Sequence, residues 1–350
     1  MLRVAIVGCN YGRTVLLPAF RTDPRCEVVA LAGTDAARTA ELARAANVAR
    51  GTSDWAALVE DRTVDAVAVA VPPALQPEVA RRALDLGKPV FVEKPLAANL
   101  AGAQAMLESA LRSRRPTMID FNFPELPAWR RAKAMLDAGA VGRLRHVVVT
   151  WNVENQATRL RLKSWKTNGA GGGGLLGNFV SHCFHYLEWF CGTMSGLGGR
   201  AFTLPESDAD GSIALALAFT SGAGGSLQMS CASFLGSGHR VELYGDDGTL
   251  VLANPTLDYF RGFELMHARR ADDALRAVAI EDTGGDRLPD IRVVPVARLV
   301  QRFIDACENG GSPSPGFAEG YRVQCLIDAA RRAHATGRWI EIAPAGEPPA

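Results

Sequence analysis

Two segments of the chain carry side chains that together could oxidise an alcohol. An apolar run ends in Glu93-Lys94-Pro95, and a glycine run at residues 171–174 precedes a helical pattern that contains His182. A lysine can donate a hydrogen bond to the alcohol oxygen, and a histidine that is neutral near pH 7 can accept its proton. Lys94 and His182 facing one nicotinamide ring would form a dehydrogenase site. The next question is whether the chain binds a dinucleotide.

The composition is that of an ordinary soluble protein and argues against several classes of function. A length of 350 residues favours two domains over one. The chain has 48% hydrophobic and 21% charged residues, which is ordinary for a globular protein. A net charge of +1 provides no field that would attract nucleic acid or an anionic membrane. The seven cysteines are scattered through mostly apolar runs, as reduced core cysteines are. Without a signal-peptide pattern or a membrane-spanning apolar run, we expect a cytoplasmic protein.

The first third of the chain alternates short apolar runs with longer amphipathic ones. Unbroken Val, Ala and Ile runs are typical of parallel strands buried on both faces. Because right-handed crossovers leave few topologies, this order predicts a doubly wound α/β sheet. The predicted strands are 4–7, 28–31, 66–71, 90–92 and 117–121, and the predicted helices are 14–21, 36–46, 76–86 and 99–112.

The turn after the first predicted strand reads Gly8-Cys9-Asn10-Tyr11-Gly12-Arg13, which is not a full G-x-G-x-x-G motif. Gly8 allows the tight turn, and Gly12 allows a pyrophosphate to approach the helix amino terminus. Asn10 replaces the second glycine, and asparagine tolerates left-handed backbone better than most residues. An ordinary strand-to-helix turn is the alternative, but the position after the first strand favours a nucleotide site. The predicted cofactor-binding residues here and after later strands are Gly8, Asn10, Tyr11, Gly12, Arg13, Pro72, Glu93 and Lys94.

The end of the second strand bears on the choice between NAD and NADP. An acidic residue there commonly binds the ribose 2′-hydroxyl of NAD, but this chain has Gly33 and Thr34, with Arg38 one turn further on. The small residues leave room for a 2′-phosphate, and Arg38 could pair with it. Alternatively, Asp35 caps the next helix and Arg38 is solvated. We therefore predict NADP or NAD, with a preference for NADP.

These motifs resemble those of the glucose–fructose oxidoreductase / inositol dehydrogenase (Gfo/Idh/MocA) family over nearly the whole chain. Glu93-Lys94-Pro95 is the most specific feature, and it is accompanied by the segments 8–20, 87–92, 137–143, 244–250 and 337–341. The resemblance implies a Rossmann domain at residues 1–121. It implies a substrate-binding α+β domain at residues 122–350 with a large, mainly antiparallel open sheet. It also implies NAD(P)-dependent redox chemistry on a sugar, cyclitol or related hydroxy compound, in a homodimer or homotetramer joined through that sheet.

The pattern of the second half agrees with this plan. Short apolar runs are separated by glycine-rich turns, which is typical of strands, and helical periodicity returns near the end. The predicted strands are 147–153, 213–219, 225–233, 241–244 and 250–252, and the predicted helices are 296–307 and 318–334.

The family pattern places a lysine, an aspartate and a histidine in the catalytic group. Lys94 and His182 match the lysine and the histidine, but the aspartate position holds Asn178. A second family acid, three residues after the histidine, is replaced by His185. At i, i+4 and i+7, these three residues would share one α-helical face. Because Asn178 can orient the imidazole but carries no charge, we expect a lower pKa for His182 than in relatives with aspartate.

Further candidates for substrate binding each have a structural alternative. Asn122 follows the last predicted Rossmann strand and could bind a hydroxyl group or tie down the linker. Trp165 precedes the glycine run and could form a wall of the site, while His185 is as readily a packed residue. No acid or cysteine is spaced to complete a zinc site with His182 and His185, so we predict no metal.

Two other functions are weighed against a dehydrogenase. Loss of the carboxylate at Asn178 could mark a non-catalytic, nucleotide-sensing protein, although Lys94 and His182 are both present. The third hypothesis is a glycosidase that uses bound NAD for transient oxidation, as the resemblance allows. We favour the dehydrogenase over both.

Overall fold

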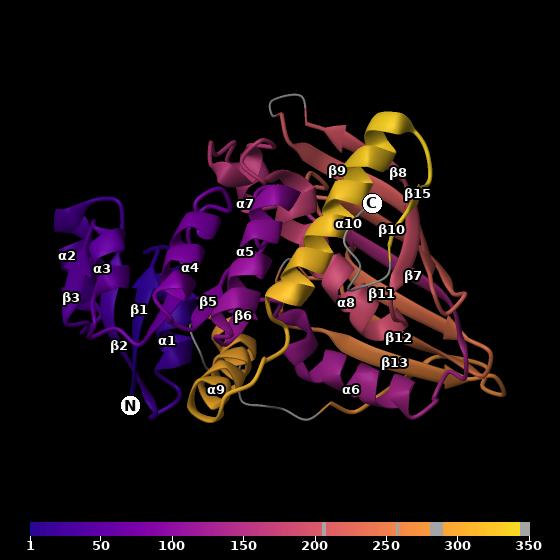
Figure 1. Cartoon of the computed structure of the whole chain (residues 1–350). Coiled ribbons are helices and arrows are strands. Elements are labelled where there is room, and N and C mark those ends of the chain that lie inside the picture. The colour runs from indigo at the N-terminus through magenta and orange to yellow at the C-terminus, as the bar shows by residue number, and fades with distance from the viewer. Residues whose placement is uncertain (205–207, 257, 259, 281–289, 344–350) are drawn as a thin grey trace. The chain divides into compact units, whose positions relative to one another are not determined.

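The computed structural model of the chain describes residues 1–204, 208–256, 258, 260–280 and 290–343. Its backbone divides into two compact units, whose elements are labelled in Figure 1. Unit 1 comprises Met1–Asn122 and Arg287–Gln324, and unit 2 comprises Phe123–Asp286 and Cys325–Ala350. The sequence analysis placed a boundary after residue 121 but kept everything beyond it in one domain. That the first domain binds the dinucleotide and the second binds the substrate and joins the subunits remains a prediction.

Unit 1 is built on six parallel strands in the order β3-β2-β1-β4-β5-β6. The strand order reverses between β1 and β4, and open α/β sheets bind ligands beyond the carboxyl ends of the strands at such a switch point. The predicted Rossmann fold is therefore confirmed. The strands are β1 (Leu2–Val7), β2 (Cys26–Ala32), β3 (Arg50–Thr52), β4 (Ala66–Val69), β5 (Val90–Val92) and β6 (Thr117–Ile119).

Three helices of unit 1 begin at a polar N-cap. Asp35, Asp54 and Asn99 each accept a hydrogen bond from the backbone N–H three residues later, which satisfies a donor that the first helical turn leaves open. The sequence analysis missed β3, because Arg50-Gly51-Thr52 has no apolar side chain for periodicity to detect. It also missed α3, which is only six residues long. The helices are η1 (Gly12–Leu16), α1 (Leu17–Phe20), α2 (Ala36–Ala45), α3 (Trp55–Glu60), α4 (Gln76–Asp85) and α5 (Leu100–Ser113).

A helix from late in the sequence completes the core of unit 1. α9 (Val293–Asn309) buries an apolar stripe that includes Phe303. The ring of Phe303 lies 6.3 Å from Phe20 and 5.9 Å from Phe91, in edge-to-face contacts. The sequence analysis grouped this helix with the second domain, whereas its stripe is buried in unit 1. Periodicity shows which face of a helix is apolar but not which partner covers it.

Unit 2 contains a nine-stranded sheet in the order β14-β13-β12-β11-β7-β10-β9-β8-β15. β10 and β7 pair in parallel, and the other neighbours are antiparallel. The predicted mainly antiparallel sheet is thereby confirmed. The strands are β7 (Leu144–Asn152), β8 (Met194–Thr203), β9 (Asp210–Phe219), β10 (Gly224–Ser230), β11 (Gly238–Gly245), β12 (Gly248–Asn254), β13 (Glu264–Arg269), β14 (Arg276–Ala277) and β15 (Ile340–Glu341).

Helices pack on one face of this sheet. α6 contacts β12 and β13 (Figure 1). Tyr186 on α8 hydrogen-bonds His239 on β11. Along β9, buried Leu215 and Leu217 alternate with exposed Ala214 and Ala216, so the less buried side of this strand carries small side chains. No helix within the described residues has the length and apolar composition required to span a membrane. The remaining helices are η2 (Phe123–Glu125), α6 (Pro127–Asp137), α7 (Gln156–Arg159), η3 (Trp165–Thr167), η4 (Leu176–Val180), α8 (Ser181–Cys191) and α10 (Phe317–Thr336).

Replacing Phe303 by alanine is expected to lower the free energy of unfolding by about 3–5 kcal/mol, because it leaves a cavity among packed rings. Chemical denaturation followed by circular dichroism measures this change. Phe202→Ala is the control, since Phe202 is 57% exposed and its truncation should matter by less than about 0.5 kcal/mol. Equal losses in the two variants would contradict the burial of α9 in the core.

Candidate active site

The turn after β1 contains two positions that only glycine can occupy. Gly8 has a φ of +114°, and a Cβ atom there would lie 2.2 Å from the carbonyl oxygen of Ala70, just beyond β4. A Cβ atom at Gly12 would lie 2.7 Å from Cγ2 of Ile6. The ends of β1 and β4 therefore come close together beneath the start of η1, where backbone N–H groups can face an anion.

The role expected for Asn10 needs correction. Asn10 is not among the described residues with positive φ, so it does not supply left-handed backbone. Its carbonyl instead accepts hydrogen bonds from the backbone N–H and the hydroxyl of Thr14, at 3.1 and 3.0 Å. Gly8 alone makes the left-handed turn, which is why a second glycine is not required there. η1, which begins at Gly12, is π-helical, a form that occurs frequently at functional sites.

Positive charge gathers at this turn. The charges of Arg13 and Arg38 lower the pKa of the Cys9 thiol, although burial is the larger effect and raises it overall. Nε of Arg13 is buried and donates to no other described residue. A buried N–H without an acceptor costs free energy, so it fits an anion that is bound during function. A phosphate is the anion that suits such a turn.

The end of β2 resolves one alternative left by the sequence. Asp35 caps α2, since its Oδ1 accepts a hydrogen bond from the backbone N–H of Arg38 at 2.7 Å. Gly33 lies against the turn, because a Cβ atom there would be 2.4 Å from Oγ1 of Thr39 and 2.9 Å from Sγ of Cys9. The side chains of Thr34 and Arg38 are exposed. The capping role of Asp35 is therefore confirmed, and its carboxylate is engaged in that cap.

Lys94 lies just beyond β5, at the same edge of the sheet as the turn. The backbone N–H of Glu93 donates to Val69 at the end of β4. The side chain of Gln76, fully buried at the start of α4, donates through Nε2 to the carbonyls of Glu93 at 2.9 Å and Pro95 at 2.7 Å. Gln76 thus holds the backbone on both sides of Lys94. The sequence analysis missed it because a polar residue in a helical pattern looks like an exposed one.

A second missed residue, Asp120, follows β6. Its backbone N–H donates to Val92 at 2.9 Å, and its Oδ2 accepts a hydrogen bond from the Tyr11 hydroxyl at 2.8 Å. Asp120 is 1% exposed, and burial raises its pKa well above the usual range, helped by the nearby charge of Glu93. Pro72, after β4, is exposed and starts the turn that leads into α4. These strand ends bring the predicted cofactor residues of unit 1 to one edge.

The glycine run of unit 2 is required by close backbone packing. A Cβ atom at Gly173 would lie 1.9 Å from the carbonyl oxygen of Trp165. Gly174 has a φ of +77°, and its Cβ atom would lie 2.4 Å from Oδ1 of Asp210. The other carboxylate oxygen of Asp210 accepts the backbone N–H of Leu176 at 2.6 Å. Asp210 thereby anchors the start of η4, the turn that carries Asn178.

The helix that carries the candidate catalytic residues is not α-helical throughout. Asn178 lies in the π-helical η4, whereas His182 and His185 lie in α8. The i, i+4 spacing expected for an α-helix therefore does not describe the step from Asn178 to His182. His182 is 7% exposed and packs edge-on against Phe123, with ring centroids 5.0 Å apart. Burial lowers the pKa of His185 to about 3, which keeps its ring neutral.

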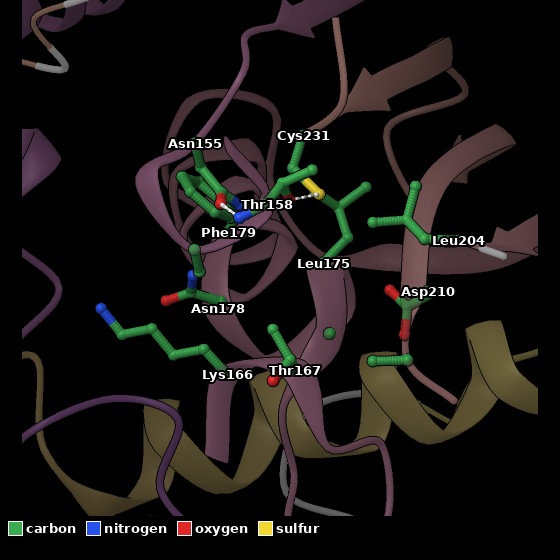
Figure 2. Close-up of a pocket in the computed structure, with 13 residues that line it drawn as sticks. Asn155, Thr158, Lys166, Thr167, Leu175, Asn178, Phe179, Leu204, Asp210 and Cys231 are labelled. Carbon is green, nitrogen blue, oxygen red and sulfur yellow. Dashed lines mark hydrogen bonds between the residues drawn. The ribbon is translucent and has the colours of Figure 1, made fainter. Parts of the chain in front are cut away.

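A small pocket in unit 2 borders Asn178 (Figure 2). Lys166, Asp210 and Cys231 also line it, and Lys166 extends to the same side as Asn178 in this view. Nζ of Lys166 lies 6.0 Å from the ring centroid of Trp165. The pocket offers about 20 Å³, which is room for about one water molecule. A sugar that reaches Asn178 must therefore bind largely outside this pocket.

The predicted site residues fall into two groups that are each well defined. Lys94 belongs to unit 1, with the cofactor turn, and Asn122 is its last residue before unit 2, only 3% exposed. Asn178, His182 and His185 belong to unit 2, together with Trp165. Within the described ranges, no group of three or more His, Cys, Asp or Glu side chains could hold a metal ion.

Replacing Gln76 by leucine should destabilise unit 1 by about 1–3 kcal/mol, because the carbonyls of Glu93 and Pro95 lose a buried donor. Thermal or urea unfolding measures this loss. Gln104→Leu on α5 is the control, since Gln104 is exposed and hydrogen-bonds to Glu108 in its own helix. The inference that Gln76 holds the Lys94 segment would be wrong if both variants were equally stable.

Comparison with known proteins agrees with this geometry. Residues 2–121 match the model described as "Oxidoreductase family, NAD-binding Rossmann fold", and residues 129–251 match the GFO/IDH/MocA C-terminal domain. The chain is 27% identical to levoglucosan dehydrogenase of Pseudarthrobacter phenanthrenivorans, over 87% of this chain and 86% of that protein. It is also 27% identical to an uncharacterized oxidoreductase of Synechocystis, over 97% and 96%.

Solved structures are similar over the full length of the chain. Levoglucosan dehydrogenase in complex with NADH superposes with a TM-score of 0.87 at 25% identity, covering 98% of this chain and 99% of that one. Both domain models belong to one family and match consecutive parts of the chain. The chain therefore belongs to the GFO/IDH/MocA family of oxidoreductases.

Proposed function

We propose that this protein is an NAD(P)-dependent dehydrogenase or reductase. It would transfer a hydride between nicotinamide and the carbinol or keto carbon of a sugar, cyclitol or related hydroxy compound. The observation that carries the proposal is the edge of the unit 1 sheet, where the Gly8–Gly12 turn and Lys94 follow neighbouring strands. Levoglucosan dehydrogenase and a 31% identical inositol 2-dehydrogenase of Saccharopolyspora erythraea, matched over 41% of this chain, support the substrate class.

The residues at the turn fit a bound dinucleotide. Because Gly8 and Gly12 have no side chains, a pyrophosphate could approach the backbone of the turn closely. The buried Nε of Arg13 would be a donor to the same anion. Asn10 and Tyr11 complete the turn, and Pro72, Glu93 and Lys94 follow the strands on the nicotinamide side. When bound, the cofactor accepts or supplies the hydride. The chain itself binds the cofactor and supplies the side chains that accept or donate the proton.

The ribose end of the site favours NADP in our proposal. Gly33 and Thr34 offer no carboxylate, and Asp35 is engaged as the cap of α2. The charge of Arg38 is near enough to the turn to act on Cys9. A 2′-phosphate would find a cation there, whereas a 2′-hydroxyl would lack the acid that NAD sites commonly use. A solved structure of levoglucosan dehydrogenase contains NADH, so NAD is the alternative.

Proton transfer is assigned to Lys94 and His182. We propose that Lys94 donates a hydrogen bond to the substrate oxygen and stabilises negative charge that develops there. His182 accepts the hydroxyl proton during oxidation and returns it during reduction. Asn178 orients the imidazole without adding charge. Asn122, Trp165 and His185 are the remaining candidates for substrate contact.

Assembly and location also stay predictions. A homodimer or homotetramer through the nine-stranded sheet is supported by the exposed small side chains of Ala214 and Ala216 on β9. A second subunit could pack closely against such a face. A cytoplasmic location is expected from the sequence alone.

The cofactor preference is tested by titrating the purified protein with NADPH and NADH and following their fluorescence. We expect tighter binding of NADPH, and Arg38→Ala should weaken it about tenfold or more while changing NADH binding by less than about twofold. Arg44→Ala, an exposed arginine on the same helix, is the control. If Arg38→Ala weakens both cofactors equally, Arg38 does not read the 2′-phosphate. If neither cofactor binds, a non-catalytic role replaces the enzyme proposal.

The role of Asn178 is tested by Asn178→Asp. A carboxylate there should stabilise the imidazolium of His182, so the acidic limb of the oxidation rate against pH should move upward by about one unit. Asn155→Asp adds a carboxylate at the same pocket from α7 and serves as the control. An unmoved acidic limb in Asn178→Asp would show that position 178 does not act on the proton acceptor. Recycling of bound cofactor without net redox change would instead indicate the glycosidase.

A further inference from the structure

The neighbourhood of Asp120 is the most unusual feature of unit 1. Oδ2 accepts the Tyr11 hydroxyl, whereas Oδ1 is buried and accepts a hydrogen bond from no other described residue. Asp120 and Glu93 are neighbours at this strand end, because Ile119 pairs with Val92 in the β5–β6 ladder and the backbone N–H of Asp120 donates to Val92. Burial raises the pKa of Asp120, and the charge of Glu93 and a hydrogen-bonding contact with its carboxyl group raise it further. Two carboxylates cannot hydrogen-bond each other, because neither has a proton to donate. A proton on Oδ1 removes the conflict and satisfies both groups.

The surrounding charges give an independent argument for this proton. Glu93, Lys94 and Tyr11 face Asp120 from the end of β5 and the start of η1. Behind Tyr11, the guanidinium of Arg292 lies 5.1 Å from the ring centroid and pairs with Asp290 at 2.6 Å. The cations Lys94 and Arg292 thus already balance the anions Glu93 and Asp290. A negative charge on Asp120 would be additional to these four. A further buried negative charge would have no counter-ion and would be costly.

We propose that Asp120 is a neutral carboxylic acid that donates its proton to Glu93 and acts as a positioning residue for Lys94. The pair then presents one negative charge to the ammonium of Lys94 instead of two. Two charges would hold Lys94 in an ion pair and keep it from the substrate oxygen. Through its second oxygen, Asp120 also links this strand end to Tyr11 in the cofactor turn. The part that concerns Lys94 rests on the proposed function, while the protonation state does not.

Infrared difference spectroscopy tests the protonation state without any turnover. The spectrum of the native protein near neutral pH, minus that of Asp120→Asn, should contain the carbonyl band of a protonated carboxylic acid. The band should fade as the pH is raised. A difference spectrum that shows only carboxylate bands would overturn the proposal, whether or not the protein is a dehydrogenase.

Unfolding measured against pH is a second test. An aspartate in the unfolded chain loses its proton above about pH 4, whereas the buried Asp120 keeps its proton because its pKa is raised. Above about pH 4 the folded protein therefore binds one proton more than the unfolded chain. The free energy of unfolding then decreases as the pH rises toward the folded-state pKa. Asparagine cannot titrate. The unfolding constant of the native protein relative to Asp120→Asn should therefore rise with pH, by up to about tenfold per unit. A ratio that is constant or falls with pH would show that Asp120 is ionised.

Kinetics separates positioning from a purely structural role. Asp120→Leu removes the links to both Tyr11 and Glu93, and kcat/KM should fall about tenfold or more. Asp120→Asn keeps an acceptor for Tyr11 and a donor for Glu93, so it should recover most of that loss. Equal losses in both variants would mean that the negative charge is required and would overturn the proposal. Absence of activity in the native protein would count against the proposed function alone.

Discussion

The close approach of the strand ends at the switch point of the parallel sheet is the constraint on which the rest of unit 1 depends. The backbone passes so near Ala70 that Gly8 admits no side chain. This contact brings the turn after β1 beside the end of β4, and the ladder then sets β5 and β6 in register with them. Side chains from four distant segments therefore meet at one edge. Lys94, Tyr11 and Asp120 owe their proximity to that geometry.

In unit 2, different contacts position the candidate residues. Its candidate residues lie on a helix whose start is held by Asp210 and by a glycine run that passes within contact of the Trp165 backbone. Both candidate segments begin with π-helical turns, η1 in unit 1 and η4 in unit 2. A π turn costs stability relative to an α turn and is found frequently at functional sites. Both π-helical turns therefore lie in the segments that carry candidate site residues.

Buried polar groups connect the fold to the chemistry. Gln76 binds the carbonyls on both sides of Lys94, and Asp120 joins Tyr11 to the Glu93 carboxyl. Each is buried almost completely, so each would be costly without its partners. Their partners in turn belong to the candidate site. The buried hydrogen bonds that hold this edge of the sheet together therefore also position the backbone of Lys94.

Local patterns in the sequence determined the fold class and the elements that carry several candidate residues. Unbroken apolar runs between amphipathic segments predicted the parallel sheet. Short apolar runs separated by glycine-rich turns predicted strands in the second half, and the family resemblance implied that these strands form a mainly antiparallel sheet. Lys94 after a buried strand and His182 on a helix after a glycine run were placed correctly on their elements. These features are encoded within a few neighbouring residues, which is why periodicity and turn chemistry reveal them.

Only the tertiary structure decided the contacts between residues far apart in sequence. Tyr11 and Asp120 are 109 positions apart, and no pattern in either segment indicates the other. The same is true of α9, whose apolar stripe was visible but whose partner in unit 1 was not. Asn10 was expected to adopt left-handed backbone, and Gly8 does so instead. A sequence indicates which secondary structure a segment can form. Long-range packing determines which buried groups come into contact and therefore which of them must share a proton.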